Sequence, residues 1–136
     1  MTFITETDSI KIIKNDFKLV HLPTFPLFYL GYGENKYEMS HGNFTIDKFY
    51  DSKVPLRKFS IIENMQNSLK VKFYDSEFYL TCLFKFTDDI LIIDIIEHTN
   101  NANRLWINIP ATESEEIFGC GEQYSYLNLR GKRVPL

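Results

Sequence analysis

Apolar and polar residues alternate with a period of two in the middle of the chain. Residues 69–74 and 78–86 each follow this pattern, and the turn-forming pair Asp75 and Ser76 separates them. A period of two places alternate side chains on opposite faces of a strand, so the two segments predict a β-hairpin.

Two further apolar segments extend this pattern toward residue 110. Residues 90–97 follow the polar turn at 87–89 and are so apolar that we expect a third strand buried on both faces, or nearly so. Residues 104–109 follow another polar turn and place three aliphatic side chains on one face and Trp106 on the other. This segment is predicted to be the fourth strand of the run.

The first half of the chain has a weaker pattern. Residues 17–22 alternate imperfectly and stop at Pro23, which predicts a strand that ends early or lies at a sheet edge. Residues 31–43 hold three glycines among aromatic and charged residues, so we expect a loop there with at most one short strand. Residues 117–136 contain glycines and charges without a clean period, and we interpret them as a loop.

Composition supports an all-β fold. The chain has 136 residues, the size of one ordinary domain, and its 12 Phe, 8 Tyr and 1 Trp occur largely in short runs with Ile and Val. Strands at intervals of about 10 to 14 residues, joined by polar turns and without long amphipathic helical windows, predict an antiparallel β-sandwich or barrel.

Charge and hydropathy argue against several partners. The chain carries 15 Lys and Arg against 18 Asp and Glu, a net charge of −3, without a basic block that could follow a phosphate backbone. No apolar run approaches the roughly 20 residues that span a bilayer, and the first residues lack a basic segment followed by an apolar one. We therefore expect no nucleic acid or membrane partner, no cofactor, and a cytoplasmic protein.

Titratable residues do not form a catalytic or metal-binding pattern. Three glutamates stand close together before residue 117, where general acid–base catalysis is one interpretation and a solvated turn is the one we favour. The three histidines are far apart in sequence, and their spacing does not suggest a metal site. Cys82 shares a strand face with four apolar residues, which predicts a buried thiol. The glutamates are Glu113, Glu115 and Glu116, and the histidines are His21, His41 and His98.

Residues 119–121 form a Gly-Cys-Gly segment directly before Glu122 and Gln123. The pattern superficially matches a dinucleotide-binding glycine loop, but the third glycine is missing and no amphipathic helix follows. We interpret the glycines as allowing a tight or left-handed turn that presents Glu122 and Gln123 from a loop edge, and a purely structural turn is the alternative.

The last twenty residues carry a more specific signal. Residues 117–136 read Ile-Phe-Gly-Cys-Gly-Glu-Gln-Tyr-Ser-Tyr-Leu-Asn-Leu-Arg-Gly-Lys-Arg-Val-Pro-Leu. This segment closely resembles a signature of family 31 glycoside hydrolases, and its continuation Gln-x-Ser-Tyr-x-x-x-Arg-Gly-Lys resembles the sulfoquinovosidase branch. Residues 103–106 and 42–46 are similar to the corresponding pieces of that branch in order and spacing, so the resemblance covers most of residues 40–136.

This resemblance implies an N-terminal β-sandwich of the galactose mutarotase type, which packs against a (β/α)8 catalytic barrel. It also implies a retaining, exo-acting α-glycosidase of the α-glucosidase or sulfoquinovosidase type, whose nucleophile and acid–base carboxylates both lie in the barrel. No residue of 1–136 can be assigned to either carboxylate, so we expect a single N-terminal sandwich segment without catalytic residues or a metal. The partners that the resemblance implies are an α-glycoside such as an α-sulfoquinovoside, bound by the full-length parent, and the barrel of the same polypeptide.

The resemblance also suggests a use for the glycine-containing loop. In the family, a loop of the N-terminal domain reaches toward the mouth of the barrel, and residues 119–130 are a candidate for part of it. We expect Glu122, Gln123 and Arg130 either to line the substrate approach or to brace the interface between domains. The bracing role is favoured because polar residues between glycines can satisfy buried backbone groups. Relatives continue beyond residue 136, so we also expect an incomplete sandwich whose exposed edges promote self-association.

Two other functions stay open. A stand-alone carbohydrate-binding module could use Trp106, Tyr124 and Tyr126 as platforms for sugar rings, although burial is the commoner reason for such aromatics in strands. A small lipid-carrying β-barrel fits the length and the aromatic content, but it needs about eight to ten closed strands, and residues 23–60 offer few candidates. The terminal signature favours a glycosidase segment over both.

Overall fold

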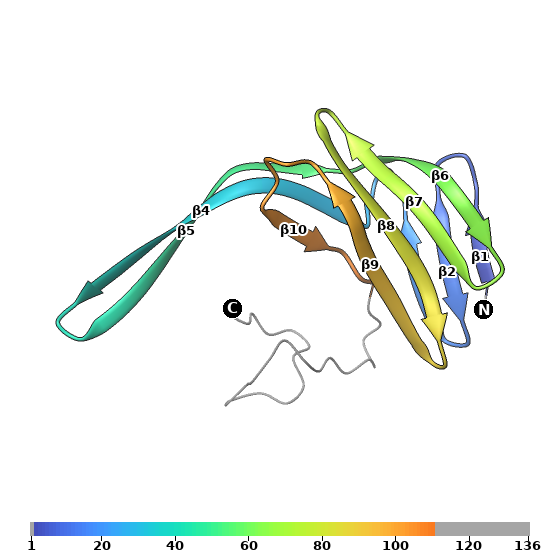
Figure 1. The fold of residues 1–136 in the computed structure, drawn as a ribbon, viewed down its shortest axis with the longest axis horizontal. Helices are drawn as coiled ribbons and strands as arrows, with labels where there is room; N and C mark the ends of the chain where they lie inside the picture. Colours follow the sequence, from blue (N-terminus) through green and yellow to red (C-terminus); the bar gives the residue numbers. More distant parts are fainter. Residues whose placement is uncertain (1, 111–136) are drawn as a thin grey trace.

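The computed structural model describes residues 2–110, which fold into antiparallel β-strands with no helix in that range (Figure 1). Consequently, these residues contain no helical segment of the length and hydrophobicity needed to cross a membrane. The predicted all-β antiparallel fold is confirmed. In chain order, the strands are β1 (Thr2–Thr5), β2 (Ile10–Lys14), β3 (Phe17–His21), β4 (Phe28–Ser40), β5 (Asn43–Pro55), β6 (Lys58–Met65), β7 (Ser68–Asp75), β8 (Phe78–Thr87), β9 (Ile90–His98) and β10 (Arg104–Ile107).

The described strands form three sheets that pack in two layers. One layer is the meander β6-β7-β8-β9, and the other contains the sheet β1-β2-β3 and the body half of the sheet β10-β4-β5. Phe28 of β4 reaches across the layers, where its ring centroid lies 5.1 Å from that of Phe73 and 6.5 Å from that of Phe84. This arrangement is an open sandwich and not the closed barrel that the lipid-carrier hypothesis requires.

The core lies between the two layers and is almost wholly apolar. Alternate residues of β7 and β8 point into it, and they meet side chains from β2, β3 and the start of β4. Burying one such large side chain contributes about 1.5–3 kcal/mol to stability. The buried hydrophobic residues are Ile10, Ile12, Leu19, Leu27, Phe28, Leu30, Leu56, Leu69, Val71, Phe73, Leu80, Cys82, Phe84 and Ala102.

The predicted meander is confirmed in position and order. The segments predicted at 69–74, 78–86 and 90–97 are β7, β8 and β9, and Cys82 is buried as expected. Ser76 and Asp88 adopt positive φ angles of 53° and 55° in the two connecting turns. β3 also lies at the edge of its sheet, in agreement with the prediction for the segment that stops before Pro23.

Two expectations about the end of this run were wrong. The segment predicted at 104–109 does form a strand, but β10 pairs with β4 and does not continue the meander beside β9. β9 is not buried on both faces, because it is the last described strand of its sheet and no described strand covers its outer edge. Ile90, Ile95 and Ile96 are 65%, 40% and 49% exposed.

The largest correction concerns residues 31–43, which form most of β4 and the turn of a long hairpin and not a loop. β4 and β5 are 13 residues long each and pair with one another, and their outer half projects from the body as an arm (Figure 1). The glycines are explained by the hairpin itself. A Cβ atom on Gly31 would lie 2.1 Å from the Ser52 carbonyl oxygen, so only glycine fits there. His41 and Gly42 form a two-residue turn with φ angles of 51° and 79°, which favours glycine at the second position.

Candidate functional site

The residues predicted to face the substrate or a second domain lie outside the described range of 2–110. These residues are Glu122, Gln123 and Arg130, and their roles stay predictions. Of the segments that carry the family resemblance, residues 103–106 are fully described and define the candidate site. The other candidates outside the described range are Glu113, Glu115, Glu116, Tyr124 and Tyr126.

Asn103 and Arg104 tie the start of β10 to the arm. The Asn103 side chain accepts a hydrogen bond from the Gly33 N–H and donates one to the Gly33 carbonyl, both at 2.8 Å. The backbone N–H of Asn103 donates to the Gly31 carbonyl at 3.0 Å. Arg104 Nη2 donates to Asn35 Oδ1 at 2.9 Å. An amide side chain therefore takes the place that a neighbouring strand would fill for Gly33. We call these contacts of Asn103 and Arg104 with β4 the arm brace.

The arm brace lies where the pairing of β4 with β5 changes register. Tyr32 pairs with Ser52, but the next residue, Gly33, pairs with Tyr50, so Asp51 is an extra residue on β5. Tyr32 N–H donates to Ser52 Oγ at 3.0 Å at this bulge. Because a bulge bends and twists a hairpin, this point sets the direction in which the arm leaves the body. The arm brace holds the chain at that point.

Trp106 packs next to the arm brace. A Cβ atom on Gly31 would lie 3.1 Å from the indole Cζ3, and the ammonium of Lys53 lies 4.9 Å from the indole centroid and 5.1 Å from the ring of Tyr29. Much of the indole is therefore already in contact with its own sheet. This arrangement favours the structural interpretation of Trp106 over an open platform for a sugar ring.

Sequence reasoning found residues 103–106 but missed their partners Gly33, Asn35 and Lys53. Gly33 and Asn35 fall in residues 31–43, which were interpreted as a loop, and Lys53 falls in residues 23–60, which offered few strand candidates. The usable signal is the pair of glycines two residues apart, Gly31 and Gly33, because glycines inside a strand mark bulges and close backbone approach.

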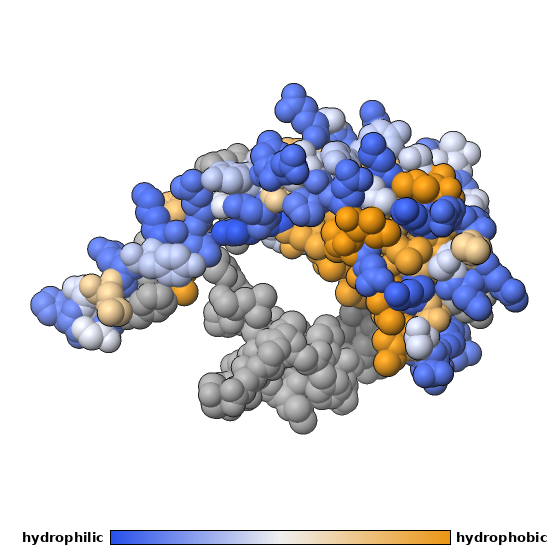
Figure 2. Space-filling model, in the orientation of Figure 1, coloured by the Kyte–Doolittle hydropathy of each residue, from blue (hydrophilic) through white to orange (hydrophobic). Residues whose placement is uncertain are grey.

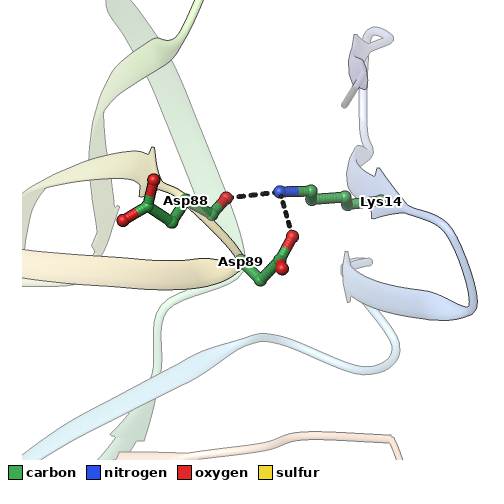
Figure 3. A network of polar contacts seen from close by, with 3 residues as sticks. All are labelled: Lys14, Asp88 and Asp89. Carbon is green, nitrogen blue, oxygen red and sulfur yellow. Dashed lines mark hydrogen bonds and ion pairs between the residues drawn. The ribbon is translucent and has the colours of Figure 1, made fainter.

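A cavity of about 580 Å³ opens between the β2–β3 turn and the β8–β9 turn. At its rim, Lys14 forms an ion pair with Asp89 at 3.0 Å and donates to the Asp88 carbonyl (Figure 3). The Lys14 ammonium also lies over the ring of Phe86. The Asp89 side chain is 93% exposed, so its carboxylate lies in solvent and is not enclosed in a catalytic cleft. The apolar lining consists of Phe17, Leu19, Phe86, Leu91, Ile93 and Ile109.

The buried titratable groups His21 and Cys82 have surroundings that fit a structural role. His21 Nδ1 accepts the N–H of Leu27 at 3.1 Å, so the ring proton lies on Nε2, which donates to the Arg57 carbonyl at 3.1 Å. Burial lowers the pKa of His21, an effect that the Arg57 carbonyl partly opposes. Burial raises the pKa of Cys82 to about 12, so its thiol is not a nucleophile at neutral pH. Within residues 2–110, no group of three or more His, Cys, Asp or Glu side chains is placed to bind a metal ion.

The fold and the site define an antiparallel β module in which the polar side chains of residues 103–104 hold its own strands together. No family model matches the chain. A sulfoquinovosidase of Agrobacterium fabrum is 32% identical to it over 137 residues and covers 100% of it. A sulfoquinovosidase of Escherichia coli is 31% identical over 120 residues and covers 87% of it. The chain spans only 20% and 18% of these two relatives.

A solved structure agrees with these relatives. A family 31 sulfoquinovosidase from E. rectale, in complex with the aza-sugar inhibitor IFGSQ, matches with a TM-score of 0.80 and 26% identity, over 96% of this chain and 19% of that one. The predicted resemblance is thereby confirmed: the chain is homologous to a segment of the family 31 sulfoquinovosidases and shares its fold.

Proposed function

We propose that this chain is the N-terminal β-sandwich segment of a retaining α-glycosidase of the sulfoquinovosidase type, with a structural role and no hydrolysis of its own. The observation that carries the proposal is the similarity to sulfoquinovosidases over the full length of the chain, combined with a match to only about a fifth of each relative. The carbohydrate partner is then a terminal α-glycoside that the complete enzyme binds.

The three aspartates that form ion pairs in the described residues support a role without catalysis. A retaining glycosidase places two carboxyl groups about 5 Å apart, with one kept protonated by its surroundings. Here, Asp75, Asp89 and Asp94 each pair with a cation, at 3.6, 3.0 and 2.9 Å. Each pair has at least one partner whose side chain is about half exposed or more, so all three are ordinary surface ion pairs.

The arm brace supports an architectural role for the segment. Asn103 and Arg104 belong to a segment that resembles the sulfoquinovosidases, and they fix where the arm leaves the body. The chain continues from β10 toward Glu122, Gln123 and Arg130, for which we propose the interdomain bracing role. The lining of the substrate approach is the alternative for these three residues.

A chimera tests the proposal. The 120 matched residues of the E. coli sulfoquinovosidase are replaced by their counterparts from this chain, and hydrolysis of a chromogenic α-sulfoquinovoside is measured. We expect the chimera to hydrolyse the substrate and the isolated 136-residue chain to give only the buffer rate. If Glu122 and Arg130 brace the domains, a chimera with Glu122→Ala and Arg130→Ala should have lower thermal stability than the parent chimera, with a smaller effect on kcat.

Two results would contradict the proposal. Turnover by the isolated chain would show that it carries its own catalytic groups. A folded chimera that retains the barrel but shows no activity would show that this segment cannot take the place of its counterpart in the relative. Titration of the isolated chain with free sugars tests the hypothesis of a stand-alone carbohydrate-binding module, because only such a module would show saturable sugar binding.

A further inference from the structure

The hydrophobic core of the described residues is open along one side of the sandwich. Among the described strands, β3 and β9 are edge strands of the two layers, and both contribute to the lining of the cavity of about 580 Å³. Phe86, Leu91 and Ile93 line this cavity and also pack against the buried core. Figure 2 shows hydrophobic residues gathered on the surface along β9. Because native interiors are close-packed, the cavity is an unfilled extension of the core.

The lining of the cavity suits apolar side chains. Phe17 and Ile109 are 41% and 59% exposed, so large apolar surface is left in contact with water. The polar lining residues belong to the two turns at the rim, where Lys14 already pairs with Asp89 at 3.0 Å. The volume is comparable to that of pockets that hold drug-sized molecules, so more than one large side chain can enter.

The chain itself leads to this cavity at the end of the described range. Asn108 holds the backbone just after β10, because its N–H donates to the Leu27 carbonyl at 2.8 Å and its side chain donates to the Pro26 carbonyl at 2.7 Å. The next residue, Ile109, lines the cavity. The residues that follow Ile109 therefore start beside the opening.

Ile117 and Phe118 are the first large apolar residues after this point. Residues 110–116 read Pro-Ala-Thr-Glu-Ser-Glu-Glu, and glutamates are almost never fully buried without a partner. An extended chain spans about 3.3 Å per residue, so the eight steps from Ile109 to Ile117 reach about 26 Å. Ile117 and Phe118 can thus enter the cavity while the glutamates stay in water.

Attachment to Ile109 favours these two residues over other occupants. A short flexible tether holds a segment at an effective concentration in the millimolar range. A second copy of the chain would have to reach a similar concentration to compete. Any segment beyond residue 136 is held by a longer tether, and effective concentration falls as a tether lengthens past the distance that it must span.

We propose that Ile117 and Phe118 dock in the cavity between β3 and β9 and close the open side of the core. This contact joins two parts of one chain, so it does not rest on the proposed hydrolase role. It adds to that role, because it fixes the point at which the loop of residues 119–130 begins.

Disulfide formation tests the contact directly. In a Cys120→Ser background, Phe118→Cys is combined either with Leu91→Cys in the cavity or with Ile62→Cys on β6, at the far edge of the same sheet. Mild oxidation should link the first pair within one monomer and should not link the second pair, although Ile62 is 47% exposed. Cys82 should not interfere, because it is buried and its thiol stays protonated at neutral pH.

Binding of the dye ANS measures whether the cavity is closed. ANS binds exposed hydrophobic surface, so Phe118→Ser should raise its fluorescence several-fold over wild type. Tyr126→Ser removes an aromatic side chain from the same part of the chain and is the matched control, which should match wild type. Circular dichroism checks that every variant keeps the wild-type strand signal.

Three results would overturn the proposal. A Leu91→Cys, Phe118→Cys disulfide that joins two chains would assign the cavity to a second copy. A folded chain in which this pair does not link, or links no better than the Ile62→Cys pair, would show that residue 118 is not held at β9. Equal ANS fluorescence of Phe118→Ser and Tyr126→Ser would show that Phe118 does not close the cavity.

Discussion

The body and the arm of this molecule are built from the same kind of strand but are stabilised differently. In the body, Phe28, Phe73 and Phe84 are completely buried between two layers. In the arm, Tyr37 and Met39 are 64% and 77% exposed, and Figure 2 shows mostly hydrophilic surface there. The two regions share β4, whose first residues belong to the core and whose last residues reach the tip of the arm.

This difference shows how stability is divided along one strand. Burial of a large apolar side chain contributes about 1.5–3 kcal/mol, whereas a cross-strand pair in a solvated hairpin contributes about 0.2–1 kcal/mol. A two-stranded hairpin is only marginally stable in water without further packing. The arm therefore depends on its base, where Asn103 and Arg104 hold the bulge.

The largest expected effect comes from Phe73→Ala in the body. Phe73 is fully buried and contacts the rings of His21, Phe28, Phe59 and Phe84, so its removal leaves a cavity. We expect a loss of about 3–5 kcal/mol in the free energy of unfolding, measured by urea denaturation.

The matched control for that substitution is Phe49→Ala in the arm. Phe49 is 47% exposed and lies under the ammonium of Lys36 at 5.0 Å, so the loss should stay below about 1 kcal/mol. Equal losses for the two variants would show that body and arm do not differ as described.

A smaller effect is expected at His21, and it depends on pH. The neutral ring accepts from Leu27 and donates to the Arg57 carbonyl, and burial holds its pKa below the ordinary value of 6.5. The unfolded chain therefore binds a proton more readily, so stability is complete above pH 6.5 and falls as the pH drops from 6.5 toward the folded pKa.

His21→Gln tests the source of this pH dependence. The variant should lose about 1–3 kcal/mol at neutral pH through the lost contacts, and its unfolding free energy should decline less between pH 6.5 and the folded pKa. His41 and His98 are both exposed and serve as controls when changed to Gln. An unchanged acid slope in His21→Gln would assign the pH dependence to other groups.

Asn103→Ala tests the arm brace. The substitution removes two hydrogen bonds to Gly33, and we expect a cost of about 1 kcal/mol that falls mainly on the arm. Amide hydrogen exchange should accelerate at residues 33–40 and stay unchanged in β7 and β8. Asn101→Ala, an exposed position in the same connection, is the control. Uniform acceleration across both regions would contradict a local brace.

The smallest effect is expected for Asp89→Asn at the cavity rim. The Lys14–Asp89 ion pair is largely exposed on the aspartate side, so its loss should cost less than about 1 kcal/mol and should shrink further at high salt. Thermal unfolding at low and high ionic strength measures both effects. A large, salt-independent loss would mean that the rim is more deeply buried than its exposure indicates.

The sequence predicted the meander well because its strands alternate cleanly. Val71, Phe73, Cys82 and Phe84 follow a period of two, and polar turns separate their strands. The arm was missed because its strands have no buried face, so apolar and polar residues do not alternate clearly along them. Its glycines also resemble those of a loop. Local composition does not reveal that Gly31 is required by the Ser52 carbonyl, which lies 21 residues further along the chain.

Long-range pairing also explains the errors at the end of the described range. β10 was placed beside β9 because they are consecutive, but its partner is β4, more than 70 residues away. β9 is apolar enough to suggest a fully buried strand, yet no other described strand pairs with its outer edge. Short sequence motifs were enough to show the resemblance to sulfoquinovosidases. They did not show that Asn103 and Arg104 contact Gly33 and Asn35, about 70 residues earlier in the chain.

Native-state amide hydrogen exchange on the wild-type chain tests the central claim most directly, namely that the buried body and the braced arm differ in stability. The amides of β7 and β8 should exchange only through global unfolding, and those of residues 34–40 should exchange at least about a hundredfold faster. Equal protection of the arm and the body would contradict the account.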